Sequence, residues 1–112
     1  MKYVLLIHSN ENGWKELSED EQKAIYGEYM AVSEAKGVYG GAQLQPVSTA
    51  TTVRVQDGRT LTTDGPFAET KEALGGFYLF EADNLDDAIE LAARIPAART
   101  GGGVEVRPIV EM

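Results

Sequence analysis

The chain contains no cysteine and only one histidine, His8. Without cysteine it can form no disulfide bond, no thiolate nucleophile and no cysteine-bound metal site. A single histidine supplies too few nitrogen ligands for a structural zinc site. We therefore expect a protein that works with neither a metal nor another cofactor.

Long hydrophobic runs are also missing. The apolar run near the N-terminus spans only Val4 to Ile7, far less than a signal peptide or a membrane span requires. This predicts a cytoplasmic protein without a membrane partner. Basic residues are in the minority, because 18 acidic against 10 basic side chains give a formal charge of −8, which repels phosphate backbones. Nucleic acid is therefore not an expected partner.

The remaining composition is that of an ordinary globular protein. Hydrophobic residues make up 43% of the 112 residues and charged residues 25%, a mixture too apolar for a disordered chain. A chain of this length forms one hydrophobic core. We expect a single domain over residues 1–112.

Periodicity and turn signals predict an alternation of strands and helices. A helix is predicted over residues 20–36, because Ser18 and Glu21 have the spacing of a capping box. A hairpin is predicted around Asp57-Gly58, the two-residue turn that favours one. A second helix begins after Asp83 or Asn84 and stops before Pro96. The predicted strands cover residues 2–8, 38–44, 50–56, 59–63, 76–81 and 104–110.

This order, β-α-β, a hairpin and then β-α-β, is typical of a ferredoxin-like α+β fold. Its antiparallel sheet carries two helices on one face. The other face then needs cover, and a second copy of the same sheet is the simplest cover for so small a chain. We therefore predict a homodimer in which two sheets pack face to face.

The run DGPFAETKE, which begins at Asp64, resembles a known family. Together with ATTVRV at residues 50–55 and VEVRP at residues 104–108, it resembles the YCII-related family in the branch named for its DGPF motif. The resemblance covers nearly the whole chain. It implies a ferredoxin-like, dimeric α/β-barrel fold with a cleft between sheet and helix. It also implies a regulatory setting, since members of this branch are often encoded beside extracytoplasmic-function sigma factors.

The resemblance also points to one acidic residue. A His-Asp pair is proposed as the acid-base centre in another branch, and the motif acid here is Asp64. No histidine lies in the helix predicted over residues 20–36, where the paired histidine would be expected, so the pair is not carried over intact. Asp64 directly precedes Gly65-Pro66, where the proline restricts the backbone. A carboxylate held in place in this way is suited to act as a general base or to orient a ligand. The alternative is that it accepts backbone N–H bonds and closes the turn.

The residues after the motif supply further candidates for substrate binding. Phe67 is expected mainly as a core anchor, with a ligand platform as the alternative. Lys71 could meet a substrate carboxylate while Glu69 or Glu72 holds it in place. The alternative is a solvated surface, on which such ion pairs contribute only about 0–1 kcal/mol.

Helix periodicity singles out Glu28, which falls within the apolar stripe of the first predicted helix. That stripe comprises Leu17, Ala24, Ile25, Ala31, Val32 and Ala35. A carboxylate pointing at the sheet must be paired, hydrogen-bonded or protonated. A catalytic role and a structural pairing with Arg54 or Arg107 both satisfy this requirement.

His8 is the only side chain whose ordinary pKa lies near neutrality, which makes it a candidate general base. The alternative is a hydrogen-bonded residue at the rim of the sheet. Alternation places His8 on the strand face of Val4 and Leu6. Three further residues, Tyr29, Tyr78 and Arg107, are candidates for lining the same cleft.

Two functions fit these residues. One is a cofactor-independent lyase or isomerase that acts on a small carboxylate-bearing metabolite, with Asp64 or His8 as base, Glu28 as its partner, and Lys71 or Arg107 as anion holder. The other is a non-catalytic ligand sensor or protein-interaction domain associated with sigma-factor regulation. It needs a ligand pocket or an exposed apolar patch but no converging acid-base groups.

Overall fold

The structure is a computed structural model and describes residues 1–68 and 70–111. Over these residues it contains strands, α-helices and two short 3-10 turns. In chain order the elements are β1 (Lys2–Ser9), α1 (Glu11–Lys15), α2 (Glu19–Ser33), β2 (Val38–Gln43), η1 (Val47–Thr49), β3 (Thr51–Gln56), β4 (Arg59–Asp64), β5 (Ala73–Glu81), α3 (Leu85–Ala93), η2 (Pro96–Ala98) and β6 (Gly103–Pro108).

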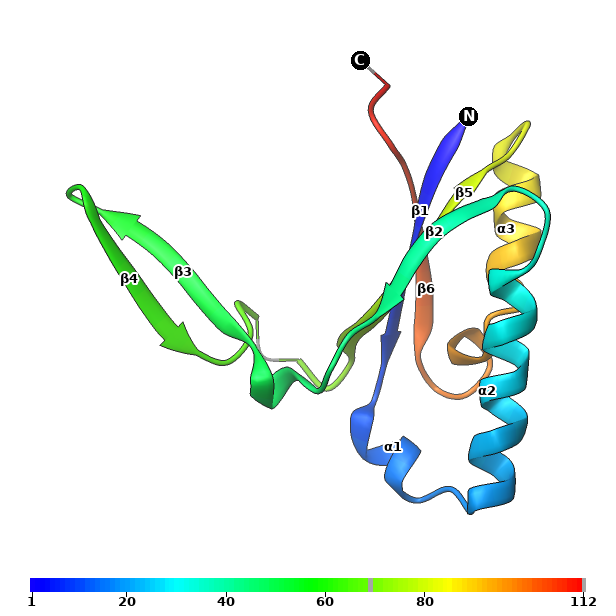
Figure 1. Ribbon diagram of the computed structural model, residues 1–112, viewed down its shortest axis with the longest axis horizontal. Helices are drawn as coiled ribbons and strands as arrows, with labels where there is room; N and C mark the ends of the chain where they lie inside the picture. The colour runs from blue at the N-terminus through cyan, green and yellow to red at the C-terminus, as the bar shows by residue number, and fades with distance from the viewer. Residues whose placement is uncertain (69, 112) are drawn as a thin grey trace.

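Four strands form the main sheet, in the order β2-β5-β1-β6 with every neighbouring pair antiparallel. Both long helices, α2 and α3, cover one face of this sheet (Figure 1). The opposite face, called the open face below, carries no helix formed by the described residues. The predicted ferredoxin-like α+β fold is confirmed.

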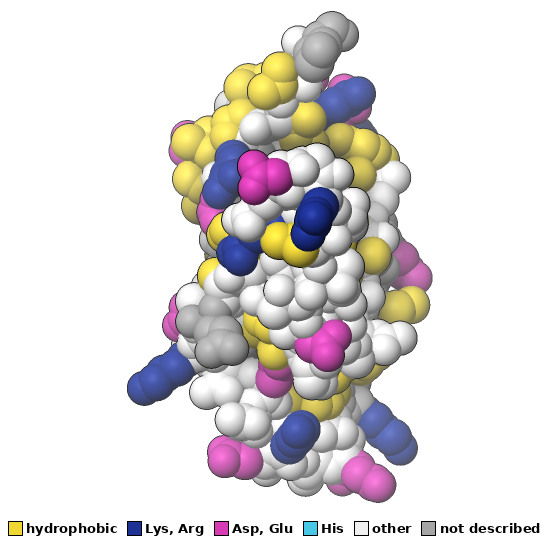
Figure 2. Space-filling model, turned by 90° about the vertical axis from the view of Figure 1, so that its left-hand side faces the viewer, with side chains coloured by type: hydrophobic (Ala, Val, Ile, Leu, Met, Phe, Trp, Pro, Cys, Tyr) yellow, Lys and Arg dark blue, Asp and Glu magenta, His cyan; other side chains and the backbone are white. Residues whose placement is uncertain are grey.

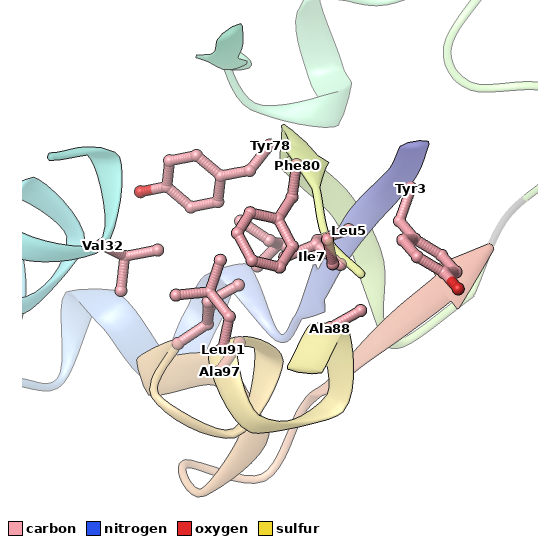
Figure 3. Packing of buried hydrophobic residues seen from close by; sticks show 11 residues of the cluster. Tyr3, Leu5, Ile7, Val32, Tyr78, Phe80, Ala88, Leu91 and Ala97 are labelled. Carbon is pink, nitrogen blue, oxygen red and sulfur yellow. The ribbon is translucent and has the colours of Figure 1, made fainter. Parts of the chain in front are cut away.

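The core lies between the sheet and the two helices because β1 alternates strictly. Tyr3, Leu5 and Ile7 are buried and point toward the helices, whereas the residues between them are half-buried on the open face. Figure 3 shows Leu5 and Ile7 beside Phe80 of β5, with Leu91 of α3 close to them, and Tyr3 belongs to the same buried cluster. Alternation predicted the two faces of this strand, and the structure shows which of them packs against the helices.

The capping box of α2 forms as predicted. Glu21 donates its backbone N–H to the Ser18 hydroxyl, and the Ser18 backbone N–H donates in return to the Glu21 carboxylate. Hydrogen bonding to the carboxylate, first from the Ser18 backbone N–H and then from the Ser18 side chain, lowers the pKa of Glu21. The helix ends at Ser33 rather than at Lys36. A short helix, α1, was not predicted, because its residues Glu11–Lys15 lie in a polar, apparently loop-like run capped by Asn10.

The other predicted boundaries need small corrections. Asn84 caps α3 as expected, but Pro96 opens the turn η2 instead of simply ending the helix. β5 begins at Ala73, earlier than predicted, and β6 ends at Pro108, earlier than the predicted Val110. No helix within the described ranges is long and apolar enough to cross a bilayer.

The predicted hairpin forms a separate two-stranded sheet, β3-β4, which we call the arm (residues 51–64). Its turn has positive φ at both Asp57 (51°) and Gly58 (75°), the geometry that matches the twist of two-residue hairpins. The arm projects away from the main sheet and makes a wide angle with the open face (Figure 1). The radius of gyration is accordingly 15.8 Å, whereas a compact domain of this length has about 13 Å.

Two glycine substitutions are expected to have opposite effects on stability. Gly41 has a φ of 151°, and an added Cβ would overlap the carbonyl oxygen of Phe77 on the neighbouring strand. Gly41→Ala should therefore lower the free energy of unfolding by about 1–3 kcal/mol. Gly27 lies inside α2 with no atom near an added Cβ, so Gly27→Ala should raise it by about 0.5–1 kcal/mol. Urea unfolding of both variants measures the difference, and equal shifts would contradict the described path of β2.

Candidate functional site

The open face brings together three charged or titratable side chains, His8, Glu105 and Arg107. Glu105 lies opposite Leu6 in the pairing of β1 with β6, so His8 is its diagonal neighbour on the same face. His8 Nε2 is 3.9 Å from Glu105 Oε1, within ion-pair distance. Arg107 Nε donates to Glu105 Oε2 at 2.7 Å, and its terminal nitrogen contacts the same oxygen. We call these three residues the His8 cluster.

The His8 cluster is suited to moving a proton. The permanently charged guanidinium of Arg107 donates to Oε2 of Glu105. The other carboxylate oxygen, Oε1, is the one nearest the imidazole. The nearest carboxylate oxygen of Glu105 lies at ion-pair distance from the imidazole, so the two groups can exchange charge with a substrate side by side. The His8 side chain is 32% exposed, so a substrate can reach it.

Glu105 was missed by the sequence analysis, although His8 and Arg107 were both candidates. A signal was present, since Glu105 and Arg107 alternate with valines and must share one face of their strand. Only the strand order, with β6 beside β1, reveals that this face is also that of His8.

Asp64 lies at the exposed end of β4, at the base of the arm. The turn beside it is closed by other groups: Gly65 N–H donates to the Ala50 carbonyl at 2.8 Å, and the Thr52 hydroxyl donates to the Gly65 carbonyl at 2.8 Å. Within the described residues the Asp64 carboxylate makes no hydrogen bond or ion pair. Turn closure by its side chain, one of the two predicted roles, is therefore not what the structure shows.

The loop after the motif is exposed. Phe67 is 76% exposed, so the expectation of a core anchor is wrong, and the ring lies under the Arg54 guanidinium at 5.1 Å. Lys71 and Glu72 are exposed as well. The Thr70 hydroxyl donates to the Glu72 carbonyl at 2.6 Å. Glu69 lies outside the described residues.

Glu28 lies on the helix side of the sheet and pairs with Arg99, which follows η2. Neither predicted partner, Arg54 or Arg107, is the one observed. The Glu28 side chain is 43% exposed, so it does not point into the core as the helix periodicity suggested. Figure 1 shows α2 on one side of the sheet and the end of β4 on the other. The chain therefore does not bring Glu28 together with Asp64 or His8.

Tyr29 and Tyr78 also belong to the helix side. The Tyr78 hydroxyl donates to the backbone carbonyl of Tyr29 at 2.9 Å, which ties β5 to α2. Burial raises the pKa of both phenols, and for Tyr29 a backbone hydrogen bond from Ala97 offsets part of the rise. Both side chains contribute to the packing between sheet and helix rather than to the His8 cluster.

Two depressions on the described surface each have a volume of about 510 Å³. One lies beside α3. The other lies on the open face at the end of the sheet remote from His8 and is lined by Lys2, Tyr39, Leu79, Ile109, Val110 and Glu111. Neither contains His8, Asp64 or Glu28, so within the described chain these residues do not converge in one pocket. Over residues 1–68 and 70–111, no three histidine or carboxylate side chains are placed to hold a metal ion.

Comparison with known proteins agrees with this fold. The family model of the YCII-related domain matches residues 1–112. The chain belongs to the YCII-related domain family. One relative of this chain is an uncharacterized protein from Rhizobium meliloti (strain 1021), 37% identical over 115 residues, which cover 97% of this chain and 92% of the relative.

A solved structure is similar to this YCII-related chain in fold. It is 5-chloro-2-hydroxyhydroquinone dehydrochlorinase from Burkholderia phenoliruptrix AC1100, in complex with 2,5-dihydroxybenzoquinone. The TM-score is 0.57, with 14% identity, and the match covers 100% of this chain and 96% of the other. At that identity the similarity concerns the fold alone.

Proposed function

We propose that this YCII-related protein is a cofactor-independent enzyme of lyase or isomerase type, which acts on a small carboxylate-bearing metabolite at the His8 cluster. The observation that carries the proposal is the approach of Glu105 to His8, with Arg107 holding the carboxylate from the other side. Three such groups on one accessible face are the constellation that proton transfer requires.

In the proposed reaction, neutral His8 removes a proton from a C–H bond next to a carbonyl or carboxyl group. In an elimination, the electron pair left on carbon forms a C=C bond as the leaving group departs, and the imidazolium gives its proton to the leaving group or to water. In an isomerisation, the pair shifts within the substrate, and the imidazolium gives its proton back to the substrate at another atom. Glu105 stabilises the imidazolium during this step. We assign the substrate carboxylate to Lys71, whose ammonium group makes no ion pair with a described residue. Asp64, exposed at the base of the arm, is the second candidate base.

The dehydrochlorinase of similar fold gives limited support. Its name describes the removal of hydrogen and chloride, which is an elimination. An elimination of this type fits the reaction class proposed for the present chain, although the substrate proposed here is different. We further assign the chain to the DGPF branch on the residues of its motif, and we propose a cytoplasmic location.

A solvent-exchange experiment tests the proposal on the unmodified protein. The protein is incubated in D2O with a set of small 2-oxoacids, and proton NMR follows the C–H signals next to the carbonyl group. The expected result is that at least one compound exchanges its proton for deuterium faster than in buffer alone. Exchange at the buffer rate for the whole set would contradict acid-base catalysis on this substrate class.

A second candidate function is a non-catalytic ligand sensor or protein-interaction domain, associated with sigma-factor regulation. The exposed apolar side chains of the arm favour it, since Val53 and Val55 are 58% and 67% exposed. The same NMR samples distinguish the two functions. Shifted ligand signals without deuterium exchange would favour the sensor.

A further inference from the structure

The open face carries apolar side chains that begin directly beside His8. Leu6 precedes His8 by two residues in β1, and it shares this face because side chains alternate along a strand. Phe77 of β5 lies directly opposite Leu6 in the pairing of the two strands, so it lies on the same face. Both residues are half-buried. Glu105 and Arg107 lie on the other side of β1, along β6. The surroundings of His8 therefore have a charged side and an apolar side.

A bulge in β5 adds a third apolar side chain, Leu74, to this surface. His8 pairs with Leu74, although the preceding residue of β1 pairs with Gly76. Gly75 is therefore an extra residue on one strand, which defines a β-bulge. Strict alternation along β5 would turn Leu74 toward the helices, whereas the bulge places it opposite His8 and on the same face. Leu74 is 38% exposed there. We call the three residues the apolar strip: Leu6, Leu74 and Phe77.

The apolar surface continues along β1 and β5 beyond the apolar strip. Val4 pairs with Leu79, and both are half-buried on the open face. Leu79 also lines the depression at the far end of this face. Figure 2, which views the molecule from the arm side, shows hydrophobic side chains gathered in its upper part, the end that carries both termini in Figure 1. A substrate group that leaves His8 in this direction on the β5 side therefore meets apolar side chains.

We propose that the substrate at the His8 cluster is a 2-oxoacid with an apolar substituent on the carbon that loses its proton. This inference rests on the proposed function and names its substrate class. Lys71, assigned above to the substrate carboxylate, precedes β5 at the end where Ala73 pairs with Ser9, the residue after His8. The apolar strip leads from His8 in the opposite direction. A substrate that runs from carboxylate through carbonyl and reacting carbon to an apolar group matches this order.

Strand geometry sets the size of the substituent. Two residues along a strand cover about 7 Å, which is the interval from His8 to Leu6. Directly opposite residues have Cβ atoms about 5 Å apart, so Leu74 lies closer still to His8. A branched alkyl group or a phenyl ring spans this interval and covers the apolar strip. A second carboxylate in the same place would lose its hydration among apolar side chains.

Two compounds of similar shape and different charge test the proposal on the unmodified protein. The compound 5-methyl-2-oxohexanoate differs from 2-oxoglutarate only in that an isopropyl group replaces the terminal carboxylate. Proton NMR in D2O gives kcat/KM for deuterium exchange at the carbon next to the carbonyl group, after subtraction of the buffer rate. The isopropyl compound should be preferred on the order of 10²-fold, because a single apolar contact already contributes about 10-fold or more. Equal kcat/KM values would overturn this inference alone, whereas exchange of no 2-oxoacid would overturn the proposed function as well.

A cation placed in the apolar strip should shift this preference toward 2-oxoglutarate. Leu74→Arg should raise kcat/KM for 2-oxoglutarate relative to the isopropyl compound by about 10-fold, because an arginine–carboxylate contact replaces an apolar one. Leu85→Arg is the matched control, since Leu85 is 49% exposed but lies in α3 on the other side of the sheet. It should leave the ratio of the two kcat/KM values unchanged. A ratio that Leu74→Arg does not move, or that both variants move equally, would overturn the assignment of the strip to the substituent.

Discussion

Replacing His8 by glutamine is expected to slow the deuterium exchange catalysed by this protein by about 10²–10⁴-fold, the usual contribution of a positioned general base. Glutamine keeps a polar side chain of similar length but cannot take up a proton near neutral pH. The His8 side chain is only 32% exposed, and glutamine is chosen because its similar length keeps most of that packing. Circular dichroism and the midpoint of urea unfolding should therefore remain close to those of the unmodified protein, so that the effect can be assigned to chemistry.

Two glutamates serve as a matched pair for this experiment. Glu105 and Glu28 each pair with an arginine, and their side chains are 42% and 43% exposed, but they lie on opposite sides of the sheet. Glu105→Gln should give a loss smaller than that of His8→Gln, because it removes only the group that orients and stabilises the imidazole. The Glu28→Gln variant should catalyse deuterium exchange at the rate of the unmodified protein. If Glu28→Gln slowed the exchange more than Glu105→Gln, the chemistry would lie on the helix side of the sheet. That result would contradict the His8 cluster as the site.

The local elements of the fold were predictable because their signals are local. Ser18 and Glu21 are three residues apart, and Asp57-Gly58 contains its whole turn, so neither depends on the rest of the chain. The short helix α1 escaped prediction because its polar residues bury no side chain and leave no periodic pattern. That the arm leaves the sheet could not be read from residues 51–64, whose alternation suits a strand in any sheet.

The site was less predictable because it depends on strand order. His8 and Glu105 are far apart in sequence, and they meet only because β1 and β6 are neighbours. Glu28 was misjudged for a related reason. Helix periodicity placed it between Ala24 and Ala31, but both alanines are exposed and only Val32 of α2 is buried. Alanine fits both the surface and the core of a helix, so an alanine-rich stripe indicates the buried face poorly.

Ile95→Ala is expected to lower the free energy of unfolding by about 2–5 kcal/mol, the usual cost of a cavity in a core. Ile95 is fully buried where α3 passes into η2. The turn η2 contacts α2, β1 and β6, so a cavity there has packed elements on several sides and little room to collapse. Small domains have a total stability of about 5–15 kcal/mol, which makes this a large fraction.

Ile89→Ala is the control for this change, because Ile89 lies in α3 with half of its surface exposed. The same side-chain truncation should there alter the free energy of unfolding by about 0.5 kcal/mol or less. Urea unfolding of both variants at one protein concentration measures the difference. If the two losses were equal, the core would not depend on η2. The turn also leads into β6, the strand that places Glu105 beside His8, so the same packing lies next to the His8 cluster in the chain.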